Sequence, residues 1–100
     1  MRVAWTKAAD KNLQAIYDYI AQTSADYARR MIDKIVARAG QIAAFPLSGR
    51  IVPEFQFGQL REVFERPYRI IYLIRPDRID IITVLHMSRD LNASDKSSAN

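Results

Sequence analysis

Two runs of β-branched and aromatic residues near the C-terminal end most constrain the fold of this chain. They cover Tyr68–Ile74 and residues 79–86, and the segment 75–78 between them is polar and carries Pro76-Asp77. Such runs are typical of strands, and Pro-Asp suits the central positions of a type I turn. The pattern therefore predicts a β-hairpin within a buried sheet.

The first half of the chain has helical periodicity instead. Apolar residues recur at helical spacing over residues 7–22 and again over residues 25–44, with Thr6 and Ser24 at the N-cap positions. The link between the two segments is very short, which predicts an antiparallel helical hairpin. A short strand is expected at residues 3–5. The buried face of the second helix is expected to consist of Tyr27, Ala28, Met31, Ile32, Ile35, Val36, Ala39 and Ile42.

Two further strands are expected at residues 50–52 and 60–64, ahead of the hairpin. The fold class is then α+β: an N-terminal strand, an antiparallel helical hairpin, and a three- to four-stranded, mainly antiparallel sheet with the helices on one face. Both faces of the strand at 68–74 are mainly apolar, so the second face needs cover from a loop, the tail or a partner. We expect a single domain at residues 1–91 and a flexible polar tail at residues 92–100.

Composition excludes several classes of protein. The chain has 100 residues and no cysteine, so a disulfide framework and a thiolate metal site are ruled out. No motif indicates a metal or a cofactor, and neither is expected. No apolar run is long enough to span a membrane and the first residues lack a signal-peptide core, so we expect a cytoplasmic protein.

Arginine dominates the charge. The formal net charge is +4, and eleven of the fifteen basic residues are arginine. Because the guanidinium group favours planar contacts with phosphate or carboxylate, this composition suits an acidic partner, either nucleic acid or an acidic peptide.

Four residues could carry chemistry. His86, the single histidine, could act as the acid or base of a ribonuclease, or it could end a strand and bond locally. Arg61, Arg69 and Arg89 could hold a phosphate and stabilise its developing charge. The alternative for these arginines is pairing with acidic residues of the same half of the chain, namely Glu62, Glu65, Asp80 or Asp90.

A series of short motifs from residue 3 to residue 91 resembles the ParE/RelE superfamily of toxins from type II toxin–antitoxin systems. The motifs are Trp5-Thr6-Lys7-Ala8-Ala9, Ile16-Tyr17-Asp18-Tyr19-Ile20-Ala21, Phe45-Pro46-Leu47-Ser48-Gly49-Arg50, Val52-Pro53-Glu54, Leu60-Arg61-Glu62, Tyr68-Arg69-Ile70-Ile71-Tyr72 and His86-Met87-Ser88-Arg89-Asp90. Their order and spacing together carry the resemblance.

Within this superfamily, the RelE-like branch implies a ribosome-dependent messenger-RNA endonuclease, with His86, Arg61, Arg69 and Arg89 as its catalytic set. The ParE-like branch implies a non-catalytic inhibitor of DNA gyrase. The Pro-Leu-Ser-Gly-Arg segment and the His-Met-Ser-Arg-Asp ending look more like ParE, and residues 41–93 contain no lysine. We therefore expect the ParE-like function. A third reading is an inactive toxin that acts only as a co-repressor with its antitoxin.

The resemblance also implies partners. A cognate antitoxin, encoded by the adjacent gene, would neutralise the toxin and would alone contact operator DNA. The residues expected to bind the antitoxin or the target are Arg61, Arg69, Arg75, Arg89, Leu13 and Tyr17. A disordered acidic segment could bury apolar area on the toxin while pairing with arginines.

Overall fold

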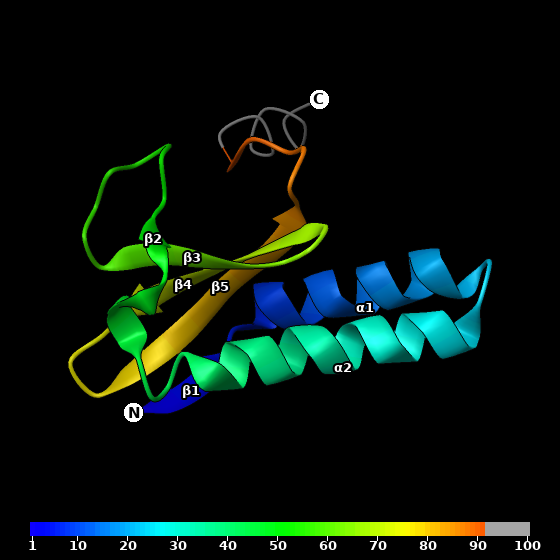
Figure 1. The fold of residues 1–100 in the computed structure, drawn as a ribbon, viewed down its shortest axis with the longest axis horizontal. Helices are drawn as coiled ribbons and strands as arrows, with labels where there is room; N and C mark the ends of the chain where they lie inside the picture. Colours follow the sequence, from blue (N-terminus) through cyan, green and yellow to red (C-terminus); the bar gives the residue numbers. More distant parts are fainter. Residues whose placement is uncertain (92–100) are drawn as a thin grey trace.

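The computed structural model describes residues 1–91 and has a helical hairpin packed on one face of a five-stranded sheet (Figure 1). This confirms the α+β class and the helical hairpin. The tail expected at residues 92–100 lies outside the described residues.

The two helices begin at the predicted caps. Helix α1 spans Lys7–Ala21 and helix α2 spans Ala25–Gln41. The Thr6 hydroxyl accepts a hydrogen bond from the Ala9 N–H and donates one to the Ile81 carbonyl, which joins the start of α1 to the sheet. Helix α2 ends three residues earlier than expected, because the N–H groups of residues 43–45 bond to carbonyls three positions back and tighten the chain into turns.

The sheet has the strand order β1-β5-β4-β3-β2. The strands are β1 (Arg2–Trp5), β2 (Arg50–Ile51), β3 (Leu60–Glu65), β4 (Tyr68–Ile74) and β5 (Arg78–His86). Strands β2 to β5 pair antiparallel, as predicted. Strand β1 adds a fifth strand that pairs parallel with β5, a long-range pairing that the local pattern did not predict.

Most of the core lies between the sheet and the helices. Four side chains in this core are fully buried: Ile70 and Tyr72 of β4, Ile35 of α2, and Ile42 directly after α2. Within α2 the expected face is wrong at two positions: Tyr27 and Val36 are each nearly half exposed. Both lie beside the stripe that faces the sheet.

The outer face of the sheet, turned away from the helices, has its own small core. Ile71 and Leu85 pack there against Val52, which follows β2, and against Leu91 near the end of the described chain. The second apolar face is therefore covered by a loop, which is one of the expected possibilities, and by the segment between β5 and residue 91, which was not among them.

Candidate functional site

Arg69 is the centre of a buried ion-pair network on the outer face of the sheet. Arg69 is only 5% exposed to solvent. The Nη1 and Nη2 atoms donate to the two carboxylate oxygens of Glu54 at 2.9 Å each, and Nε donates to Glu62 at 2.7 Å. Nη1 also donates to the carbonyl of Arg89 at 3.0 Å. Four of the five N–H bonds of the Arg69 guanidinium therefore donate to groups within the protein.

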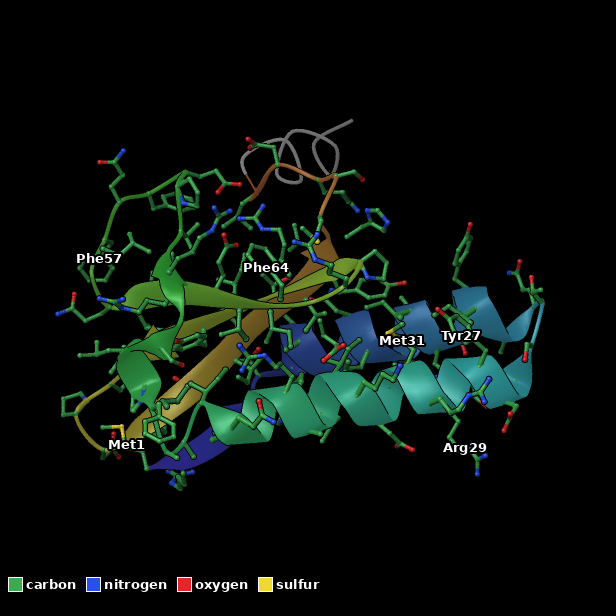
Figure 2. All side chains as sticks on the ribbon, in the orientation of Figure 1. Met1, Tyr27, Arg29, Met31, Phe57 and Phe64 are labelled. Carbon is green, nitrogen blue, oxygen red and sulfur yellow. The ribbon has the colours of Figure 1, made fainter. Side chains whose placement is uncertain are left out.

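Glu62 connects this network to the surface. Its side chain is completely buried, and its second oxygen accepts a hydrogen bond from Nε of Arg50. The Arg50 guanidinium lies 5.0 Å from the centre of the Phe64 ring, on the side of the sheet away from the helices (Figure 2). An open groove of about 600 Å³ runs over these residues, lined by Arg50, Pro53, Glu54, Phe64, Arg69, Met87, Ser88, Arg89 and Asp90.

The formal charges in and under this groove cancel. Three arginines, at positions 50, 69 and 89, are balanced by the three carboxylates of Glu54, Glu62 and Asp90. Hydrogen bonds from Arg69 lower the pKa of Glu54 to about 2, from an ordinary value of 4.5, and the same bonds raise the pKa of Arg69. A carboxylate held this acidic is a poor general base near neutral pH.

Arg61 lies on the opposite face of the sheet from Arg69, because its cross-strand partner is Tyr72, whose side chain points toward the helices. Its Nε donates to the Gly58 carbonyl and its Nη1 to the Gly49 carbonyl, both at 2.9 Å. Arg61 therefore joins the residue just before β2 to the loop that leads into β3.

Tyr72 holds the preceding turn. Its hydroxyl donates to the Pro46 carbonyl at 2.6 Å and accepts from the Gly49 N–H at 3.0 Å, inside the core. A side chain at Gly49 would collide with this hydroxyl and with the Glu62 carbonyl. The buried hydroxyl of Tyr72 thus bonds the Pro-Leu-Ser-Gly turn to β4.

His86 lies on the helix side, in a second groove of about 380 Å³ beside α1. The ring packs edge-on against Tyr68 with 5.8 Å between the ring centres. The Ser88 N–H donates to Nδ1, which leaves the proton of the neutral ring on Nε2. Because Tyr68 and His86 face the helices while Arg69 faces outward, the sheet separates His86 from Arg69. Arg89 lines both grooves.

Arg75 lies at the other end of the hairpin. It is six residues from Arg69 along β4, a span of about 20 Å. Arg75 and Arg78 both donate to Asp80, which is mostly buried, and these bonds lower the pKa of the Asp80 carboxyl. The alternative considered for Arg69, pairing with an acidic residue, therefore holds for Glu62. Asp80, which was considered as a partner for Arg61, Arg69 or Arg89, pairs with Arg75 and Arg78.

Leu13 and Tyr17 are half-buried on α1, and both line a third, shallow groove with Asp10, Gln14 and Ile32. The expected binding residues therefore occupy several separate surfaces. Their roles in binding stay predictions.

Sequence reasoning missed Glu54 as the main partner of Arg69. No local pattern in the sequence indicates this bond, because Glu54 comes over the outer face only once the Val52 N–H donates to the Leu60 carbonyl and the loop folds back. Across residues 1–91, neither a membrane-crossing helix nor a metal-binding group of histidine and acidic residues is found.

Comparison with known proteins gives consistent matches. The family model described as "ParE toxin of type II toxin-antitoxin system, parDE" matches residues 3–91. Toxin RelE2 of Caulobacter vibrioides is 35% identical over 89 residues, covering 88% of this chain and 97% of that protein. Putative toxin Y4kP of Sinorhizobium fredii is 33% identical over 87 residues, covering 85% and 86%.

Two solved structures share the fold. One is the chromosomal ParDE system of Pseudomonas aeruginosa, with a TM-score of 0.72 and 24% identity over 86% of this chain and 95% of that one. The other is the RelBE2 toxin–antitoxin complex of Mycobacterium tuberculosis, with a TM-score of 0.65 and 20% identity over 85% and 88%.

Proposed function

We propose, from the premise that this chain belongs to the ParE toxin family of type II toxin–antitoxin systems, that it arrests growth by binding DNA gyrase. The observation that carries the proposal is the separation of the residues a nuclease would need. His86 and Arg69 lie on opposite faces of the sheet, and Arg61 is directed at backbone carbonyls. Binding a protein target requires no such constellation.

The chemistry of the outer groove supports the same conclusion. RNA cleavage develops negative charge on a phosphate, which a site stabilises with uncommitted positive charge. Here Arg69 is held by two carboxylates, and Arg50 is held by Glu62. Opening these pairs to admit a phosphate would leave buried carboxylates without partners, at a cost of several kcal/mol.

We further propose that a cognate antitoxin, encoded by the adjacent gene, binds the helix side of the toxin. The apolar groove beside α1 contains Ile16, Tyr19 and Tyr68, with His86 and Arg89 at its edge. An amphipathic helix of acidic character fits such a groove, burying its apolar face while its carboxylates meet Arg89. Contact with operator DNA then belongs to the antitoxin. Leu13 and Tyr17 lie in a separate groove of the same helix, which Ile32 of α2 also lines, and their role in binding is part of the same proposal.

Gyrase inhibition is tested with toxin freed from antitoxin. Increasing toxin is added to purified gyrase with relaxed plasmid and ATP, and supercoiling is followed on agarose gels. Loss of supercoiling at toxin concentrations comparable to the enzyme is expected. Full supercoiling at a hundredfold excess of folded toxin would exclude gyrase as the target.

The second candidate is a ribosome-dependent messenger-RNA endonuclease, which the 35% identity to a protein named Toxin RelE2 favours. Induction without antitoxin separates the two, because gyrase inhibition lowers DNA synthesis first and RNA cleavage lowers protein synthesis first. Primer extension on translated messages would then show cuts. Harmless induction would point to a co-repressor without a toxic target.

A further inference from the structure

Five large apolar side chains are exposed within one short segment, residues 45–57. Their exposed fractions are 70% for Phe45, 69% for Leu47, 42% for Ile51, 49% for Phe55 and 52% for Phe57. The segment runs from the end of α2 through β2 into the loop before β3, along one edge of the sheet (Figure 1). We call these five side chains the apolar ridge.

The apolar ridge is large enough to form the centre of an interface. With about 200 Å² for each phenylalanine, the three exposed fractions alone correspond to roughly 340 Å². Stable interfaces bury about 800 Å² on each partner, and their binding energy is concentrated in central aromatic residues. Apolar patches of a few hundred Å² on a protein surface are often functional.

Side chains of β3 and β4 hold the segment that carries the apolar ridge in one conformation. Arg61 donates to the carbonyl of Gly49 within the segment and to that of Gly58 directly after it, Arg69 donates to Glu54, and Val52 is fully buried. The arginines that resembled binding residues thus fix the backbone that presents the phenylalanines. A preorganised loop loses less conformational entropy when it binds.

Charge identifies the kind of partner. The segment carries two charged residues, Arg50 and Glu54, and both are paired inward, with Glu62 and Arg69. A nucleic acid or an acidic peptide would find no net positive charge on this segment, because Arg50 is its one cation and Glu62 balances that charge. Figure 2 shows Phe57 on the outer side of the loop, away from the helices. Protruding aromatic side chains fit a concave, apolar and weakly charged pocket of another protein.

We infer that the apolar ridge is the surface by which this toxin binds its protein target. The inference rests on the proposed function, because it names the contact surface for that activity. It also separates target binding from antitoxin binding, since the ridge lies at the β2 edge of the sheet and the groove proposed for the antitoxin lies beside α1.

The test compares three forms of the toxin: the native chain, the double variant Phe55→Ser/Phe57→Ser, and Tyr27→Ser. Tyr27 is a matched control, because it is an aromatic residue of similar exposure at the far end of the helical hairpin (Figure 2). Circular dichroism and thermal unfolding verify that each form is folded. The single variants Phe55→Ser and Phe57→Ser replace the double variant if its Tm falls.

Gyrase supercoiling and growth arrest are the two readouts. We expect the double variant to need at least about 30-fold more toxin for half-inhibition of gyrase, with Tyr27→Ser within twofold of the native chain. Equal inhibition by the native chain and the double variant would show that the apolar ridge does not bind the target, while gyrase would remain the target.

If the native chain arrests growth without inhibiting gyrase, the gyrase proposal fails. Growth arrest then becomes the readout for whether the apolar ridge binds the target. Loss of arrest in the double variant then supports the ridge, and retained arrest overturns it. A native chain that neither arrests growth nor inhibits gyrase overturns both proposals. Light scattering tests whether a second copy of the chain occupies the apolar ridge instead. If the native chain is a dimer and the double variant is a monomer, the ridge is a dimer interface and target binding through it is overturned.

Discussion

Replacing Arg69 by methionine keeps most of the side-chain volume and removes the guanidinium from the buried network. Glu54 would lose both hydrogen bonds from Arg69 and keep the one from the Leu91 N–H, and Glu62 would keep the one from Arg50. Removing one partner of a buried ion pair costs about 3 to 5 kcal/mol. We therefore expect Arg69→Met to lower the free energy of unfolding by about that amount at pH 7, and the Tm by at least about 12 °C.

A second route gives a similar magnitude. The pKa of Glu54 falls from 4.5 to about 2 in the folded protein, which corresponds to about 3 kcal/mol of stabilisation at neutral pH. Because the folded pKa is the lower one, this stabilisation is complete above pH 4.5 and is lost as the pH falls from 4.5 toward 2. The difference in stability between the native chain and Arg69→Met should therefore shrink across that window.

The assay is urea unfolding followed by the fluorescence of Trp5, the single tryptophan, at pH values from 7 to 2.5. Glu54→Gln is the matched control, since it keeps the shape of the carboxyl group and removes its charge. In a double-mutant cycle, Arg69→Met and Glu54→Gln together should cost less than their sum. A loss below 1 kcal/mol for Arg69→Met at pH 7, or a difference that stays constant down to pH 2.5, would refute the reasoning.

Three further substitutions probe the remaining contacts. Tyr72→Phe strands the Gly49 N–H and the Pro46 carbonyl, and we expect urea unfolding to show a loss of about 2 to 3 kcal/mol; a loss under 0.5 kcal/mol would contradict these bonds. Arg61→Met should cost about 1 to 3 kcal/mol and speed amide hydrogen exchange at residues 49–58, and unchanged exchange would show that Arg61 does not hold the segment. His86→Ala should change stability by less than about 1 kcal/mol and leave growth arrest intact, because the ring is exposed; loss of arrest in the folded variant would restore the nuclease hypothesis.

The elements of the fold were largely predictable because their signals are local. Helical spacing and the N-caps Thr6 and Ser24 define the helical hairpin, and runs of β-branched and aromatic residues define β4 and β5. The parallel pairing of β1 with β5 was not predictable in this way, since four residues of strand carry no information about a partner some 76 positions later. The exposure of Tyr27 and Val36 depends on where the sheet ends beneath α2.

The candidate site was harder to predict from sequence. Pairing of Arg69 with Glu62 follows from adjacent strands, and it was among the alternatives considered. The bond from Arg69 to Glu54 depends on how a loop folds back over the sheet, which no period or motif encodes. The sequence also shows Phe55 and Phe57 as apolar residues without indicating that both are half exposed.

The position of β5 between β1 and β4 has a consequence for synthesis of the protein. The first strand to leave the ribosome finds its neighbour only when nearly all of the described chain has been made, so β1 and the sheet face of α1 have no β5 to pack on until then. Long-range pairing of this kind delays folding relative to local contacts. A growing chain therefore completes this sheet only after translation is almost complete, and only then are the surfaces proposed for the antitoxin and the target fully formed.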